Sequence, residues 1–341
     1  MKKETQILTT FDLNKEQQER LRKASEGVKL TVIPTSDPAA IPAERWAEAE
    51  VLYTWDVLPE PDQAPNLKWV QFGSAGVDPY LGLPLLQRDD LLFTSMSGAI
   101  TSQIAEYVLM ALLAFGQKLP KLMRNQAERR WPEQKTLWQD YLPVELRHST
   151  VGILGYGSIG RQVARLLQPF GAEVLAAKRD VMHPEDQGYT PEGMGDPHGD
   201  FFTRLYPLEA MPSLLAASDF VVVALPLTEE THHILNAEAF EAMKETAYLV
   251  NVGRGALVDE GALAAALKAG KLAGAALDVF EQEPLPEDSP LWDLENVILS
   301  PHISGLSRHL QEETLTLFEE NLNRYLVGLP LYNQVDLKKG Y

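Results

Sequence analysis

Three polar residues that could carry out acid–base chemistry follow short apolar runs in the second half of the chain. Arg254, Glu283 and His302 each stand a few positions beyond a run typical of a buried strand. The carboxyl ends of parallel strands in one sheet share an edge, so we expect these side chains to converge there. An arginine can hold a carboxylate and a ketone oxygen, and a histidine can donate a proton near neutral pH. A neighbouring carboxylate orients the imidazole and favours its charged form, so the set suits reduction of a 2-keto acid.

Each of these residues also has an ordinary interpretation. Arg254 could form a surface ion pair, Glu283 could be a solvated loop carboxylate, and His302 could belong to a capped turn. Their coincidence at three successive strand ends favours catalysis over the separate structural roles.

A glycine-rich turn at Gly155–Gly160 predicts a dinucleotide-binding site. The apolar run 151–154 precedes it and a helical pattern at 161–167 follows it, which places G-x-G-x-x-G in a strand–turn–helix context. Gly155 suits the tight turn, Gly157 lets the backbone approach a pyrophosphate, and Gly160 allows close packing of the helix. The positive end of the helix would then face the phosphates. A purely structural turn is the alternative.

The segments that must position these residues alternate short apolar runs with helical patterns. This alternation covers the first hundred residues and restarts at Val151, which predicts two parallel sheets wrapped by helices. Between them, 100–119 is a strongly apolar helical stretch, followed by an extended arm rich in Arg, Gln and Trp that ends near Leu146. Residues 181–207 interrupt the second alternation and read as a surface insertion. The helical pattern at 309–326 is expected to rejoin the first domain.

Composition narrows the classes of partner. The net charge of −18 argues against nucleic acid, and the absence of cysteine excludes disulfides and thiolate catalysis in this chain. No run of about 18 apolar residues occurs, so we expect no membrane partner. His183 and His198 lie in the insertion and are expected to be solvated, so we expect no metal. The default is a cytoplasmic enzyme or binding protein.

Several motifs together resemble those of the D-isomer-specific 2-hydroxyacid dehydrogenases. They are Gly155–Gly160, Asn251-Val252-Gly253-Arg254-Gly255, Leu277–Pro284 with Glu283, Ser300-Pro301-His302-Ile303, Ser74-Ala75-Gly76-Val77-Asp78 and the tail 328–333. The resemblance implies two doubly wound α/β domains, with a Rossmann cofactor domain at 101–304 inserted into a flavodoxin-like substrate domain at 1–100 and 305–341. Residues 101–148 would form the crossing helix and arm. A homodimer is also implied.

The resemblance implies a role for each motif residue. Arg254 would bind the substrate's carboxylate and carbonyl, His302 would be the acid/base and Glu283 its partner, while the backbone of Ser74, Ala75 and Gly76 would bind the carboxylate of a small anionic 2-keto or 2-hydroxy acid. The residues expected to bind the cofactor are Gly155, Gly157, Ser158, Ile159, Gly160, Lys178, Arg179, Leu225, Pro226, Val252, Gly253 and Asp278.

The end of the second strand of the cofactor domain predicts a preference for NADP(H), with NAD(H) also possible. An acidic residue expected about 20 residues beyond the glycines would repel a 2′-phosphate, but Lys178 and Arg179 occupy that end instead. Two cations can bind the phosphate. Asp180 follows directly, so a strand end displaced by a residue or two would favour NAD(H).

Two other classes compete with this interpretation. Formate dehydrogenases share the architecture but pair the histidine with glutamine, and Glu283 argues against them. Dehydrogenase-like corepressors bind NAD(H) and act through protein contacts. Oxidation of the reduced cofactor by 2-keto acids would separate an enzyme from such a binding protein.

Overall fold

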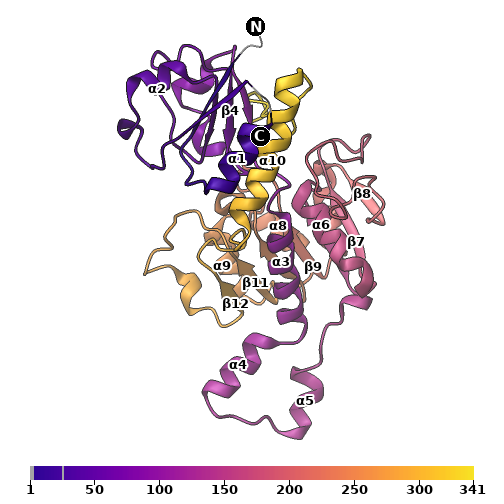
Figure 1. The fold of residues 1–341 in the computed structure, drawn as a ribbon. Helices are drawn as coiled ribbons and strands as arrows, with labels where there is room; N and C mark the ends of the chain where they lie inside the picture. The colour runs from indigo at the N-terminus through magenta and orange to yellow at the C-terminus, as the bar shows by residue number, and fades with distance from the viewer. Residues whose placement is uncertain (1–3, 25–26) are drawn as a thin grey trace. The chain divides into compact units, whose positions relative to one another are not determined.

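The computed structural model describes residues 4–24 and 27–341, which fall into two compact units. The first contains the described residues of Met1–Ile100 together with Gln187–Tyr189 and Ser307–Tyr341. The second contains Thr101–Asp186 and Thr190–Leu306. Each unit has its own parallel sheet, so the predicted class of two doubly wound parallel-sheet α/β domains is confirmed (Figure 1).

The first unit is built on a five-stranded parallel sheet in the order β2-β1-β3-β4-β5, the flavodoxin-like order. Its strands are β1 (Thr5–Thr9), β2 (Val28–Val32), β3 (Val51–Thr54), β4 (Trp69–Phe72) and β5 (Leu92–Thr94), and its helices are α1 (Lys15–Lys23), α2 (Ala43–Glu48) and α10 (Leu310–Val327).

The C-terminal helix α10 completes the core of the first unit. Its residues Leu315, Phe318 and Leu322 are buried in one cluster with Ile7 and Tyr53. The rings of Tyr53 and Phe318 stack with their centroids 4.3 Å apart. The apolar series in the sequence of this helix thus has a partner in the sheet formed by the first hundred residues.

The tip of the insertion, Gln187–Tyr189, also belongs to the first unit. The Tyr189 N–H donates to Asn333 Oδ1 at 3.0 Å, and its ring lies 5.9 Å from that of Tyr332. Gly98 has φ +87°, and a Cβ there would lie 1.9 Å from the Tyr189 carbonyl oxygen. A side chain at position 98 would therefore displace the tip.

The second unit is built on a seven-stranded parallel sheet in the order β12-β11-β10-β9-β6-β7-β8. Its order reverses between β6 and β9, which is where this class of sheet binds its ligand. The strands are β6 (Thr150–Leu154), β7 (Glu173–Ala177), β8 (Arg204–Tyr206), β9 (Phe220–Val223), β10 (Tyr248–Asn251), β11 (Gly274–Leu277) and β12 (Val297–Leu299).

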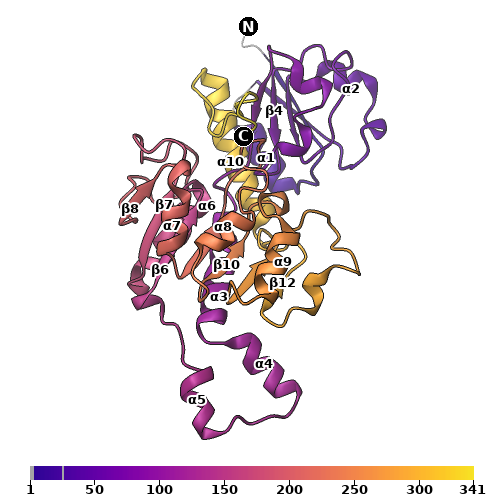
Figure 2. The same cartoon turned by 180° about the vertical axis from the view of Figure 1, so that it is seen from behind.

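Helices cover both faces of this sheet, and an arm extends from it. One face carries α3 (Thr101–Gly116) and α6 (Ser158–Leu167), while α7 (Met211–Ala217), α8 (Ala237–Ala242) and α9 (Glu260–Lys268) cover the other (Figure 2). The arm consists of α4 (Leu119–Ala127) and α5 (Gln134–Asp140) and reaches away from the sheet of its own unit (Figure 1). In the part of the chain that is described, no helix is long and apolar enough to cross a membrane.

The interpretation of 181–207 as a surface insertion needs correction. Its last residues form β8, which pairs with β7 and extends the sheet. Asp196, in its middle, is only 1% exposed. The sequence of this segment lacks a regular apolar pattern because polar contacts, rather than an apolar stripe, hold the segment in place.

Candidate active site

The glycine-rich turn connects β6 to α6 at the switch point of the second sheet. Gly155 has φ +100°, and a Cβ there would meet the Ala224 carbonyl oxygen at the end of β9 at 2.5 Å. A Cβ on Gly160 would lie 2.3 Å from the Gly155 carbonyl oxygen, so the helix packs closely on the turn. A Cβ on Gly157 would meet nothing within 4 Å. The turn therefore leaves open space at the N-terminus of α6, which fits a pyrophosphate.

The second strand of this unit ends at Ala177, as the sequence predicted, so Lys178 is the first residue beyond it. Lys178 Nζ donates to the His183 carbonyl oxygen at 2.6 Å, and Arg179 forms a 2.8 Å ion pair with Glu230. Burial and the nearby charge of Arg161 lower the pKa of Lys178, against the effect of Asp180 and other acidic neighbours.

Asp180 is engaged locally. Its carboxylate lies 2.7 Å from His183 Nδ1 and accepts from the Met182 N–H at 3.0 Å. These contacts, led by the one to His183, lower the pKa of Asp180. Lys178 and Asp180 thus both contact His183, Lys178 at the backbone carbonyl oxygen and Asp180 at the ring.

The loop that carries His302 is anchored by a buried carboxylate. Asp278 is 0% exposed and accepts from Ser300 Oγ at 2.6 Å, from the Ile303 N–H at 2.9 Å and from the Ser304 N–H at 2.8 Å. Its own carbonyl accepts from the His302 N–H at 2.8 Å. These bonds hold His302 at φ +52°, a conformation that a histidine adopts only when its surroundings enforce it.

Tyr107 of α3 extends this network, a contact that the sequence did not reveal. Its hydroxyl lies 2.7 Å from Ser300 Oγ. Since the Ser300 hydroxyl donates to Asp278, Tyr107 must donate to Ser300. Burial raises the pKa of Tyr107, which keeps the hydroxyl protonated as a donor. A helix of the predicted domain crossing therefore supports the histidine loop.

His302 and Glu283 form the predicted pair. Nδ1 of His302 lies 2.8 Å from Glu283 Oε2, and the other carboxylate oxygen accepts from the Phe280 N–H at 3.1 Å. The His302 side chain is 50% exposed. Glu283 thus fixes the ring through Nδ1 and leaves Nε2 as the nitrogen available for a substrate.

Arg254 follows β10 in a loop shaped by Asn251. The Asn251 side chain accepts from the Gly253 N–H at 3.1 Å and donates to the Arg254 carbonyl at 3.0 Å. A Cβ on Gly255 would lie 1.8 Å from the Phe280 carbonyl carbon, so this loop packs directly on the one that leads to Glu283. Because β10, β11 and β12 are adjacent and parallel, their three polar residues share one edge of the sheet.

The remaining predicted residues occupy two places. Leu225 and Pro226 follow β9 and Val252 follows β10, both at the same edge of the second sheet. Ser74, Ala75 and Gly76 follow β4 of the first unit, where Ser74 Oγ donates to the Gly76 carbonyl at 2.9 Å.

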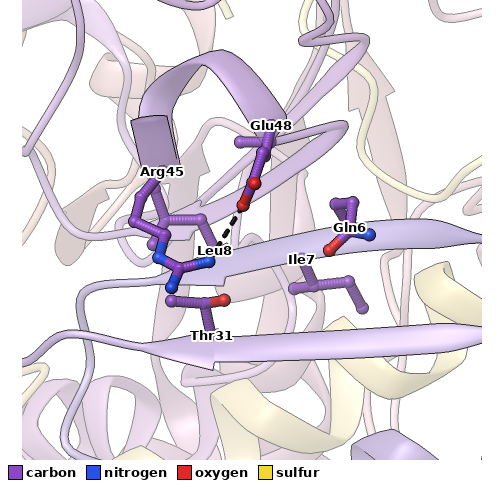
Figure 3. Close-up of a pocket in the computed structure, with 7 residues that line it drawn as sticks. Gln6, Ile7, Leu8, Thr31, Arg45 and Glu48 are labelled. Carbon is purple, nitrogen blue, oxygen red and sulfur yellow. Dashed lines mark hydrogen bonds and ion pairs between the residues drawn. The ribbon is translucent and has the colours of Figure 1, made fainter. Parts of the chain in front are cut away.

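We also searched the described residues for metal-binding clusters and for pockets. Among the residues placed by the structure, no cluster of His, Cys, Asp or Glu suits a metal ion. A small pocket in the first unit lies beside α2, β1 and β2 (Figure 3). Its charged residues, Arg45 and Glu48, form a 2.9 Å ion pair with each other, so they offer no unbalanced charge to a substrate.

Comparisons with known proteins agree with this geometry. Residues 109–304 match the model of the D-isomer specific 2-hydroxyacid dehydrogenase, NAD binding domain. Glyoxylate reductase of Thermofilum pendens is 35% identical over 269 residues, which cover 78% of this chain and 74% of the relative.

Two solved structures share the fold over nearly the whole chain. A D-isomer specific 2-hydroxyacid dehydrogenase from Xanthobacter autotrophicus in complex with NADPH and MES has a TM-score of 0.79, 31% identity and coverage of 99% of this chain and 100% of that one. NADPH-dependent glyoxylate/hydroxypyruvate reductase from Sinorhizobium meliloti, in complex with NADP and sulfate, has a TM-score of 0.77, 27% identity and coverage of 99% and 100%. With the turn, the His–Glu pair and the arginine in place, the chain belongs to the D-isomer-specific 2-hydroxyacid dehydrogenases, which transfer a hydride between a nicotinamide cofactor and a 2-hydroxy acid.

Proposed function

We propose that this enzyme reduces a small 2-keto acid, of the size of glyoxylate or hydroxypyruvate, with NADPH as the preferred cofactor. The observation that carries the proposal is the 2.8 Å pair of His302 and Glu283 on a loop anchored by Asp278, at the same sheet edge as Arg254. The names of the similar glyoxylate and hydroxypyruvate reductases support the substrate class.

Each residue has a part in the reduction. A bound nicotinamide cofactor would supply the hydride for the carbonyl carbon. Arg254 binds the substrate's carboxylate and carbonyl oxygen, and the backbone N–H groups of 74–76 bind the carboxylate. His302 donates a proton from Nε2 to the carbonyl oxygen as the alkoxide forms, and takes it back in the reverse reaction. Glu283 orients the ring through the contact at Nδ1.

The same edge of the second unit supports the cofactor preference. Lys178 is partly buried directly after β7, and Arg179 follows it. A 2′-phosphate beside Lys178 would oppose the effects of burial and of Arg161 on this ammonium group. The pairing of Asp180 with His183 supports Lys178, rather than Asp180, as the residue beside the ribose. The solved relatives bound to NADPH and NADP are consistent with this assignment.

The proposal is tested by a panel of substrates with both cofactors. Loss of the near-ultraviolet absorbance of NADPH is expected with glyoxylate and hydroxypyruvate, with lower kcat/KM for pyruvate and for bulkier keto acids. NADH should support the same reactions with lower kcat/KM. No oxidation of either cofactor by any keto acid of the panel would refute the proposed reaction.

We also propose a homodimer formed through α3 and the arm. Large apolar side chains gather there in an exposed state: Met110, Leu122 and Met123 are 44%, 45% and 56% exposed, and Trp131 and Trp138 are 93% and 73% exposed. So many exposed large apolar side chains on one helix and the arm that follows it favour a protein interface there.

Light scattering at micromolar concentration is expected to give twice the chain mass. A Trp131→Glu, Trp138→Glu double variant should shift this mass toward the monomer, because burying two carboxylates is unfavourable. Trp292→Glu is the matched control, since Trp292 is 55% exposed but lies outside the arm. A monomer mass for the unmodified protein would contradict the proposal.

A further inference from the structure

Asp196, in the middle of the segment 181–207, is a buried carboxylate that accepts several hydrogen bonds. Asp196 is 1% exposed and accepts from the N–H groups of Gly199, Asp200 and Phe201 at 3.0, 2.8 and 3.0 Å. It also accepts from the Tyr156 hydroxyl at 2.6 Å. Four donors around one buried carboxylate make it a rigid point of the segment. One of those donors comes from the glycine-rich turn.

A buried arginine of α6 joins the same segment to the cofactor turn. Arg161 is 1% exposed, and its guanidinium donates to the carbonyl oxygens of Asp196 and Pro184 at 2.5 Å each. The guanidinium also lies 4.9 Å from the centre of the Tyr156 ring. The next residue of the helix, Gln162, accepts from the Gly195 N–H at 2.7 Å. The first turn of α6 is thus held by the insertion.

Tyr156 is the link between this anchor and the phosphate-binding backbone. It stands between Gly155 and Gly157, and its N–H donates to the Ala177 carbonyl at 3.1 Å. Its side chain is 1% exposed, so the ring and hydroxyl point into the protein while the flanking glycines form the turn. The hydroxyl bond therefore restrains the conformation of the turn whose N–H groups would face a pyrophosphate.

The charges in this cluster are consistent with an anion at Asp196. Burial alone would raise the pKa of Asp196, but the bond from Tyr156, the bonds from backbone N–H groups and the charge of Arg161 leave it below its usual value. Burial, together with the bond to Asp196, raises the pKa of Tyr156. The tyrosine thus stays the donor and the carboxylate stays the acceptor.

We infer that Asp196 is a positioning residue for the cofactor: through the Tyr156 hydroxyl it holds the glycine-rich turn in the conformation that receives the pyrophosphate. This inference rests on the proposed function only in that the cofactor is a nicotinamide dinucleotide. Since NADH and NADPH share the pyrophosphate, loss of the contact weakens both. An error in the proposed NADPH preference would instead appear as a different ratio of the two Kd values in the unmodified enzyme. Failure of this inference and failure of the proposed preference are therefore distinguishable.

The test is the Tyr156→Phe variant, which removes one hydroxyl and keeps the ring against Arg161. The Kd of NADPH and of NADH, measured by the fluorescence of the reduced nicotinamide, is expected to rise about tenfold for each. The kcat at saturating cofactor and keto acid should stay within about twofold of the unmodified enzyme, because the His302 loop is untouched. Asp196→Asn should shift both Kd values in the same direction, since its amide turns a donor toward other donors.

Tyr248→Phe is the matched control. Tyr248 is 7% exposed in the same unit, and its hydroxyl accepts from Lys118 Nζ at 2.9 Å. It is the first residue of β10, at the end of the strand opposite to the cofactor edge. We expect Tyr248→Phe to lower the Tm without changing either Kd. If Tyr156→Phe also lowers only the Tm and leaves both Kd values unchanged, its role is structural and the inference is overturned.

Discussion

Replacement of His302 by alanine is expected to lower kcat by about 10²–10⁴-fold, because the alkoxide then forms without a positioned proton donor. The ring is held at Nδ1 by Glu283 and stands half exposed on its loop, so its removal leaves the fold of the second unit in place. The Kd of NADPH should stay unchanged, because the glycine-rich turn is on a different strand. Steady-state kinetics with the best keto acid of the panel gives the result.

We expect the loss of activity to decrease in the order His302, Arg254 and Glu283 when each residue is replaced. Arg254→Ala should chiefly raise KM and lower kcat/KM, because the substrate loses its carboxylate clamp. Glu283→Gln should have the smallest effect of the three, since the amide can still contact the ring. His148→Ala is the matched control: its side chain is 72% exposed in the same unit, and its ion-pair partner is Glu145. An unaltered kcat in His302→Ala would refute the assignment of the acid/base.

The sequence predicted the parts of this site that depend on local patterns. Apolar runs followed by polar residues placed Arg254, Glu283 and His302 at strand ends, and β7 ends at the predicted residue, Ala177. The glycine turn was predictable because Gly155 and Gly160 meet separate steric requirements, Gly155 against Ala224 and Gly160 against Gly155. Such patterns are short-range, so spacing alone reveals them.

The contacts that spacing cannot reveal are long-range and polar. Asp278 was expected to bind the cofactor on family resemblance, and the structure adds a task that the sequence did not suggest: both of its carboxylate oxygens accept from the His302 loop. Tyr107, almost two hundred residues before Ser300 in the chain, supports the same loop. The insertion looked like a surface loop because Asp196 and its partners have the composition of one. Only the fold shows that this carboxylate is buried against Tyr156.

The cofactor preference gives the second large expected effect. Removal of both cations in Lys178→Ala, Arg179→Ala is expected to lower kcat/KM with NADPH by about 10–10²-fold, because a phosphate dianion loses charge-assisted hydrogen bonds. Arg179 contributes less than a buried cation would, since it is exposed and already paired with Glu230. With NADH, which carries no 2′-phosphate, kcat/KM should change by less than about threefold.

A matched control separates the local effect from the change in net charge. Lys23→Ala, Lys268→Ala also removes two exposed cations, one at the end of α1 in the first unit and one at the end of α9, and it should leave the ratio of kcat/KM with NADPH to that with NADH unchanged. High salt should lower kcat/KM with NADPH more than it lowers kcat, since salt screens the charge of the exposed Arg179. A preference of the unmodified enzyme for NADH, or full retention of NADPH use by the double variant, would mean that Asp180 rather than Lys178 faces the ribose.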